Sequence, residues 1–209
     1  MTRTPAILLL SLFLAACAVT APVPEDRFYR LDRVHPEQRM SAPVLTGGLA
    51  LEYVQADPLR GGRAVLYRDS RAPLQLRRYH YQFWVDQPPR MLGRALAAYL
   101  RESGVADRVV DAGGQGEAAY RLQLRLLKFE QVHGRDGTGV EVAVEATLSA
   151  QESDTMSWTR VYERSRVCAG AGMNDTASAM QAAMTELFAA MKTDLASAKD
   201  GGEIAARPD

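Results

Sequence analysis

The fold is decided by two stretches, Tyr-Arg-Leu-Gln-Leu-Arg-Leu at residues 120–126 and Val-Glu-Val-Ala-Val-Glu-Ala-Thr-Leu at residues 140–148. In both stretches apolar side chains recur at every second position, which is typical of a strand with one buried and one solvated face. Turn residues separate them in Gly134-Arg135-Asp136-Gly137, and Trp158–Val167 has the composition of a third strand. The second half of the chain therefore predicts an antiparallel meander.

Further strands are predicted toward the N-terminus. Phe28–Leu31 and Leu49–Val54 are short strand candidates. Ala64–Arg68 and Leu74–Phe83 predict a hairpin, because the residues between them include Asp, Ser and Pro, which favour turns.

Two amphipathic helices complete the pattern. The first is predicted to open at Asp86, which can cap free N–H groups, and to end at Ser103-Gly104. The second is predicted to begin at Asn174-Asp175-Thr176, followed by apolar residues at helical spacing. The order of strands, helix, strands and helix predicts an α+β fold, with a mostly antiparallel sheet and two amphipathic helices packed on one face.

The N-terminus carries a lipoprotein signal. An apolar run from Ala6 to Leu14 is followed by Leu14-Ala15-Ala16-Cys17, the pattern of a bacterial lipobox. A spanning helix needs about 20 apolar residues, so this run is too short to remain as one. We predict cleavage before Cys17 and attachment of diacylglycerol and an N-linked acyl chain such as palmitate to that cysteine. The alternative is an ordinary cleaved signal that happens to contain a cysteine.

This signal divides the chain into four parts. Residues 1–16 are the signal peptide, residues 17–27 a lipidated tether, residues 28–197 one domain, and residues 198–209 a flexible tail. Lipidation of Cys17 leaves Cys168 as the only other cysteine, so no intramolecular disulfide is expected. A half-buried structural thiol is the preferred interpretation of Cys168, and a functional thiol is the alternative.

Neither the composition nor the motifs of the chain predict a nucleic-acid, metal or acid/base site. The chain has 25 Lys plus Arg and 25 Asp plus Glu, so no strong field favours nucleic acid. His35, His80 and His133 lie far apart in the sequence, without metal-ligand spacing. Glu141 and Glu145 are interpreted as part of a solvated strand face and not as an acid/base pair. We therefore predict no catalytic residues, no metal, no cofactor and no enzymatic activity.

One cluster, Arg77–Trp84, mixes basic and aromatic residues. Alternation places Tyr79, Tyr81 and Phe83 on one face, and Trp84 on the other face. Core packing explains such a strand, and so does an edge that binds a partner, because aromatic residues and arginine are favoured at interface centres. We name Tyr79, Tyr81, Phe83 and Trp84 as the partner-binding candidates.

At these residues the chain resembles the ABC-type transport auxiliary lipoproteins, which include the paraquat-inducible C-type proteins. The resemblance spans Phe28 to Leu195. It rests on the lipobox at Cys17 and on three further segments, Phe28-Tyr29-Arg30-Leu31, Leu66-Tyr67-Arg68 and the run from Tyr79 through Trp84-Val85-Asp86-Gln87-Pro88-Pro89.

The resemblance implies a non-enzymatic component of a lipid-transport system. The expected partners are a periplasmic mammalian-cell-entry (MCE) domain protein with an ABC permease and ATPase. A homo-oligomer is also compatible with the resemblance. Ala18 follows the lipidated cysteine in place of an aspartate, which favours the periplasmic face of the outer membrane. The alternatives are an assembly or structural lipoprotein for an outer-membrane complex and, less favoured, a periplasmic hydrolase.

Overall fold

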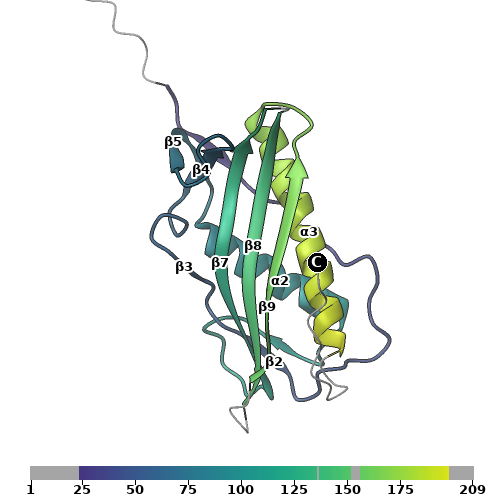
Figure 1. The fold of residues 1–209 in the computed structure, drawn as a ribbon. Helices are drawn as coiled ribbons and strands as arrows, with labels where there is room; N and C mark the ends of the chain where they lie inside the picture. Colours follow the sequence, from purple (N-terminus) through teal and green to yellow (C-terminus); the bar gives the residue numbers. More distant parts are fainter. Residues whose placement is uncertain (1–23, 136, 152–155, 198–209) are drawn as a thin grey trace, which may run out of the picture.

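A computed structural model describes residues 24–135, 137–151 and 156–197, which form a nine-stranded mixed sheet and two helices (Figure 1). The elements are β1 (Arg27–Tyr29), β2 (Leu49–Leu51), β3 (Gln55–Ala56), β4 (Ala64–Asp69), β5 (Leu76–Trp84), α2 (Pro88–Ser103), β6 (Val109–Val110), β7 (Tyr120–His133), β8 (Thr138–Ala150), β9 (Met156–Val167) and α3 (Met173–Ser197). The α+β class is confirmed. The sheet is mixed where a mostly antiparallel one was predicted.

The predicted meander is present. β7 pairs antiparallel with β8 from Tyr120↔Ala150 to His133↔Thr138, and β8 pairs antiparallel with β9. These are the three long strands at the front of Figure 1. Leu122, Leu124 and Leu126 of β7 are buried at alternate positions, as predicted, because this part of the strand turns one face to the core and the other away from it.

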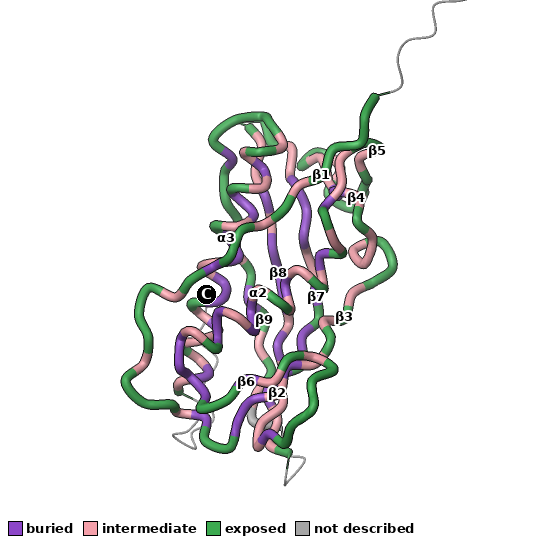
Figure 2. Tube along the Cα trace, turned by 180° about the vertical axis from the view of Figure 1, so that it is seen from behind, coloured by how far each residue is buried: buried purple, intermediate pink, exposed green. Residues whose placement is uncertain are grey.

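Parallel pairing along the other edge of β7 makes the sheet mixed. β2 pairs with residues 120–122 of β7, β3 with residues 125–126 and β4 with residues 130–133, all parallel. The predicted hairpin is confirmed, because β4 and β5 are antiparallel. β1 then adds parallel to β5, so the N-terminal end of the described chain lies beside this hairpin (Figures 1 and 2).

The buried side chains of the strands and helices form one hydrophobic core (Figure 2). Tyr99 of α2 and Phe188 of α3 meet within it, with ring centroids 5.6 Å apart. Helix α2 ends as predicted at Gly104, whose φ of 68° suits a residue without a Cβ. Its start differs from the prediction: Asp86 accepts a hydrogen bond from the N-cap residue Gln87 and pairs with Arg94, so it does not cap the helix.

A bulge in β7 changes which residues face the core. Pairing with β8 shifts between Leu126 and Lys128, so one extra residue interrupts the alternation. Leu122, Leu124 and Leu126 are buried before the bulge, and Phe129 is buried after it. Glu130, next to Phe129, is consequently directed to the opposite face of the sheet from Phe129.

Candidate functional site

The predicted partner-binding residues lie in an irregular part of β5. Ala64 pairs with Phe83 and Leu66 pairs with Arg78, so residues 79–82 of β5 stand opposite a single residue of β4. Such a bulge ends the strict alternation that assigned faces to these side chains. The structure consequently separates the four candidates into buried and exposed residues.

Two of the four candidates are held by packing or hydrogen bonds. Trp84 is 1% exposed and packs on Phe129, with ring centroids 5.3 Å apart. Tyr79 is half-buried; its hydroxyl donates to Oε1 of Gln131 at 2.6 Å, and its ring lies 4.5 Å from that of Tyr67. Trp84 therefore packs in the core of this structure and offers almost no surface to a partner.

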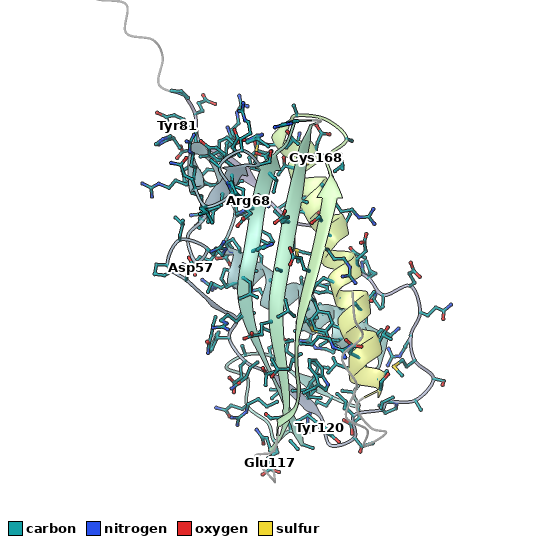
Figure 3. All side chains as sticks on the ribbon, viewed as in Figure 1. Asp57, Arg68, Tyr81, Glu117, Tyr120 and Cys168 are labelled. Atoms are coloured by element: carbon teal, nitrogen blue, oxygen red, sulfur yellow. The ribbon has the colours of Figure 1, made fainter. Side chains whose placement is uncertain are left out.

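The exposed aromatic residues gather where β1 meets β5. Tyr81 is 38% exposed and Phe28 is 53% exposed. Phe28 stacks on the half-buried Phe83 at 5.8 Å, and the Arg63 guanidinium lies 5.3 Å from the centre of the Phe28 ring. We call Phe28, Arg63, Tyr81 and Phe83 the β1–β5 aromatic patch. Figure 3 shows Tyr81 at the end of the sheet opposite to Glu117 and Tyr120.

Sequence analysis missed Phe28 and Arg63 as members of this patch. Phe28 belongs to a three-residue strand, and its neighbour Phe83 is 55 positions away along the chain. Phe28-Tyr29 was visible as an aromatic pair, but only the parallel pairing of β1 with β5 brings it to Phe83.

Structural roles suit Cys168, His35 and His133. Cys17 lies outside the described residues. Cys168 is buried near the Thr176 hydroxyl, and burial raises the pKa of its thiol, which disfavours the reactive thiolate. His35 pairs with Glu102 at 2.7 Å, and His133 contacts the Tyr79 hydroxyl at 3.0 Å. Over the described ranges of the chain, no group of three or more His, Cys, Asp or Glu side chains could hold a metal ion.

A chain of alternating charges lies on the sheet face opposite to Phe129. Glu130 is 3% exposed and contacts Arg60 at 3.0 Å and Arg68 at 3.2 Å. Arg68 also pairs with Glu141, whose other oxygen lies 3.2 Å from Lys128. Asp57 and Glu163 extend this chain at its two ends, through Arg60 and Lys128 respectively. We call these seven residues the charge ladder.

The charge ladder corrects the interpretation of Glu141 as a solvated residue. Its side chain is 17% exposed and joins β8 to β4 through Arg68 and to β7 through Lys128. Burial alone would raise the pKa of Glu141, but the hydrogen bond from Arg68 and the nearby charge of Lys128 outweigh it and lower the pKa below its usual value. Glu145 pairs with Arg125 at 2.8 Å and is more exposed. Neither carboxylate is placed for acid/base chemistry with the other.

The fold and its surface define an α+β domain with an exposed aromatic patch. Neither of the described helices, α2 and α3, combines the length and apolar character needed to cross a membrane. A family model for the ABC-type transport auxiliary lipoprotein component matches residues 29–192. The chain belongs to this family, as its resemblance predicted, and a lipoprotein family implies membrane anchoring.

Solved structures share the fold at low sequence identity. Protein XCC0632 of Xanthomonas campestris matches with a TM-score of 0.72 and 16% identity, over 83% of this chain and 97% of that one. An uncharacterised protein matches with a TM-score of 0.64 and 15% identity, over 82% and 99%. Protein CT253 of Chlamydia trachomatis matches with a TM-score of 0.53 and 8% identity, over 75% and 99%. No curated protein matches the chain by sequence.

Replacing Trp84 tests its place in the core. Trp84→Ala is expected to lower the free energy of unfolding by about 3–5 kcal/mol, because it opens a cavity beside Phe129. Tyr81→Ala is the matched control on the same strand and should cost about 0.5 kcal/mol or less. Urea unfolding followed by circular dichroism measures both variants. Equal costs would contradict the assignment of Trp84 to the core and Tyr81 to the surface.

The charge ladder predicts a pH dependence of stability. Because the pKa of Glu141 is lowered on folding, its ionised form stabilises the protein above about pH 4.5 and this stabilisation is lost as the pH falls through the folded-state pKa. Glu141→Gln is expected to cost about 2 kcal/mol at pH 7 and clearly less at pH 3. Urea unfolding at the two pH values measures this difference. Glu145→Gln, in a more exposed pair, should cost under about 1 kcal/mol at pH 7. A Glu141→Gln cost that does not change with pH would argue against the ladder.

Proposed function

We propose that this protein is a non-enzymatic auxiliary subunit of an ABC/MCE-type transport system for lipids or other hydrophobic solutes. In this proposal it is anchored through Cys17 to the periplasmic face of the outer membrane and docks the periplasmic MCE-domain subunit. The observation that carries the proposal is membership of the ABC-type transport auxiliary lipoprotein family over residues 29–192. The lipobox at residues 14–17 supports the anchor.

The position of the β1–β5 aromatic patch supports docking near the membrane. Ten peptide steps separate Cys17 from Arg27, the first residue of β1. Fully extended, they span at most about 35 Å. A lipid on Cys17 would therefore keep β1 and the β1–β5 aromatic patch close to the bilayer. An MCE-domain subunit whose tip reaches the outer membrane would meet the patch there.

The chemistry of the patch suits a protein partner. Phe28 and Tyr81 are exposed aromatic side chains, and Arg63 adds a guanidinium over the Phe28 ring. Aromatic residues and arginine carry much of the binding energy in protein interfaces. β1 pairs only with β5 among the described strands, so its other edge forms no strand pairing that would compete with a partner.

Removing the patch tests the docking role. Phe28→Ala with Tyr81→Ala is expected to weaken recovery of the MCE-domain subunit at least about tenfold, since hot-spot residues each contribute 1–2 kcal/mol or more. Affinity purification of the tagged protein from a detergent extract of the native envelope measures this recovery. Tyr53→Ala, which removes another exposed aromatic residue, is the control and should bind normally. Recovery of an outer-membrane protein complex and no MCE-domain subunit would favour the assembly lipoprotein.

Replacing the anchoring cysteine tests the attachment. Cys17→Ser is expected to abolish incorporation of labelled fatty acid, because serine has no thiol to accept the diacylglyceryl group. Labelling of growing cells followed by membrane fractionation measures it. Cys168→Ser is the control and should remain labelled, since that thiol is buried in the folded domain. Persistent labelling of Cys17→Ser would refute the anchor.

A further inference from the structure

The turn between β4 and β5 presents an apolar side chain to solvent. Leu74 is 101% exposed, the largest exposure among the exposed large hydrophobic residues of the described chain. Backbone hydrogen bonds close the turn around it: Ala72 N donates to Asp69 O at 2.9 Å, and Gln75 N donates to Ala72 O at 3.0 Å. Asp69 also accepts from Arg71, and this hydrogen bond holds the pKa of Asp69 well below its usual range. The hydrogen bonds of this turn thus hold the Leu74 side chain toward solvent.

Basic side chains follow Leu74 directly. Arg77, Arg78 and His80 are exposed on β5, whereas Arg71 is paired with Asp69. Arg77 donates to the neutral side chain of Gln75. Within the described ranges, no Asp or Glu forms an ion pair with Arg77, Arg78 or His80. An exposed leucine with unneutralised arginines behind it is the arrangement that favours an anionic lipid surface, because the side chains match its apolar and phosphate layers.

The turn lies at the end of the domain from which the chain leads back to Cys17. Ser70 N donates to His133 O at 2.9 Å, which places the turn beside the last residue of β7. The described chain enters β1 at this same end (Figures 1 and 2). The link of at most about 35 Å from Cys17 to β1 limits how far this end can move from an anchored membrane.

We propose that the β4–β5 turn is a membrane-contact site for the phospholipid leaflet that carries the Cys17 anchor. Leu74 enters the boundary between headgroups and acyl chains, and Arg77 and Arg78 bind lipid phosphates. This inference rests on the proposed anchoring at Cys17. It assigns the turn to lipid and leaves the β1–β5 aromatic patch, on the neighbouring edge, to the protein partner. Lipid contact at a second point would fix the orientation of the domain, which a tether alone cannot do.

The test places a fluorophore at the turn of the full-length lipidated protein. An environment-sensitive nitrobenzoxadiazole label is attached to Leu74→Cys in a Cys168→Ala background, and the protein is reconstituted into phosphatidylethanolamine vesicles containing phosphatidylglycerol. Tyr53→Cys is the matched control, because Tyr53 is 72% exposed and lies near the strands that pair with the first half of β7. Blue-shifted emission and quenching by brominated acyl chains are expected at position 74 and not at position 53.

A second pair of variants tests the basic residues. Arg77→Gln and Arg78→Gln, each combined with the label at position 74, are expected to lower the equilibrium between lipid-quenched and unquenched turns about fivefold per charge on anionic vesicles. On phosphatidylcholine vesicles the two substitutions should have little effect. Equal quenching of the parent and both variants on anionic vesicles would overturn the role of the arginines.

The outcomes separate this proposal from the proposed anchor. Flotation of the protein with the vesicles while both labels report water would overturn the membrane contact and leave the anchor intact. A blue shift at position 74 without quenching by brominated lipid would mean that protein covers the turn, which also overturns it. Failure of the protein to float with the vesicles would refute the anchor and, with it, the inference.

Discussion

Every part of this domain depends on β7, because that strand is paired along both of its edges. β8 occupies one edge over the whole strand, while β2, β3 and β4 follow one another along the other edge. The bulge after Leu126 lets β7 bury Leu122, Leu124, Leu126 and Phe129 on one side and still direct Glu130 to the other. The core residues and the charge-ladder residues of β7 therefore lie on opposite faces of the same strand, so a shift of that strand would disturb both.

The charge ladder covers part of the sheet face that points away from the hydrophobic core. Its members come from the segment before β4, from β4 itself and from β7, β8 and β9. Positive and negative groups alternate along it, so each buried charge has a neighbour of opposite sign. This matters most for Glu130, since a nearly buried carboxylate without partners would be strongly destabilising. The ladder thereby ties parallel and antiparallel halves of the sheet together.

The sequence predicted the strands whose alternation of apolar and polar residues runs over many positions. It did not predict the strands whose pairing partners lie far away along the chain. Alternation over residues 120–126 and 140–148 was enough to find β7 and β8. β2 and β3 have three and two residues, and their parallel pairing with β7 joins segments about 70 positions apart, so no local pattern encodes it. The alternation in β5 did not decide whether Trp84 packs in the core or faces a partner, and a bulge interrupts that strand. The partial burial of Glu141 was missed because Arg68 reaches it only through the pairing of β4 with β7. Family membership over residues 29–192, by contrast, was anticipated from the order of the motifs.

The length of β7 has a mechanical consequence. Fourteen residues of strand extend about 45 Å, and a hydrogen-bonded sheet resists the shortening that a flexible linker undergoes freely. Under the proposed anchoring at Cys17, the β4–β5 end of the sheet would lie nearest the bilayer, and Glu117 and Tyr120 lie at the opposite end (Figure 3). In that arrangement the long strands would hold the two ends of the sheet at a fixed separation, so only the end that carries the β1–β5 aromatic patch would stay within reach of the bilayer.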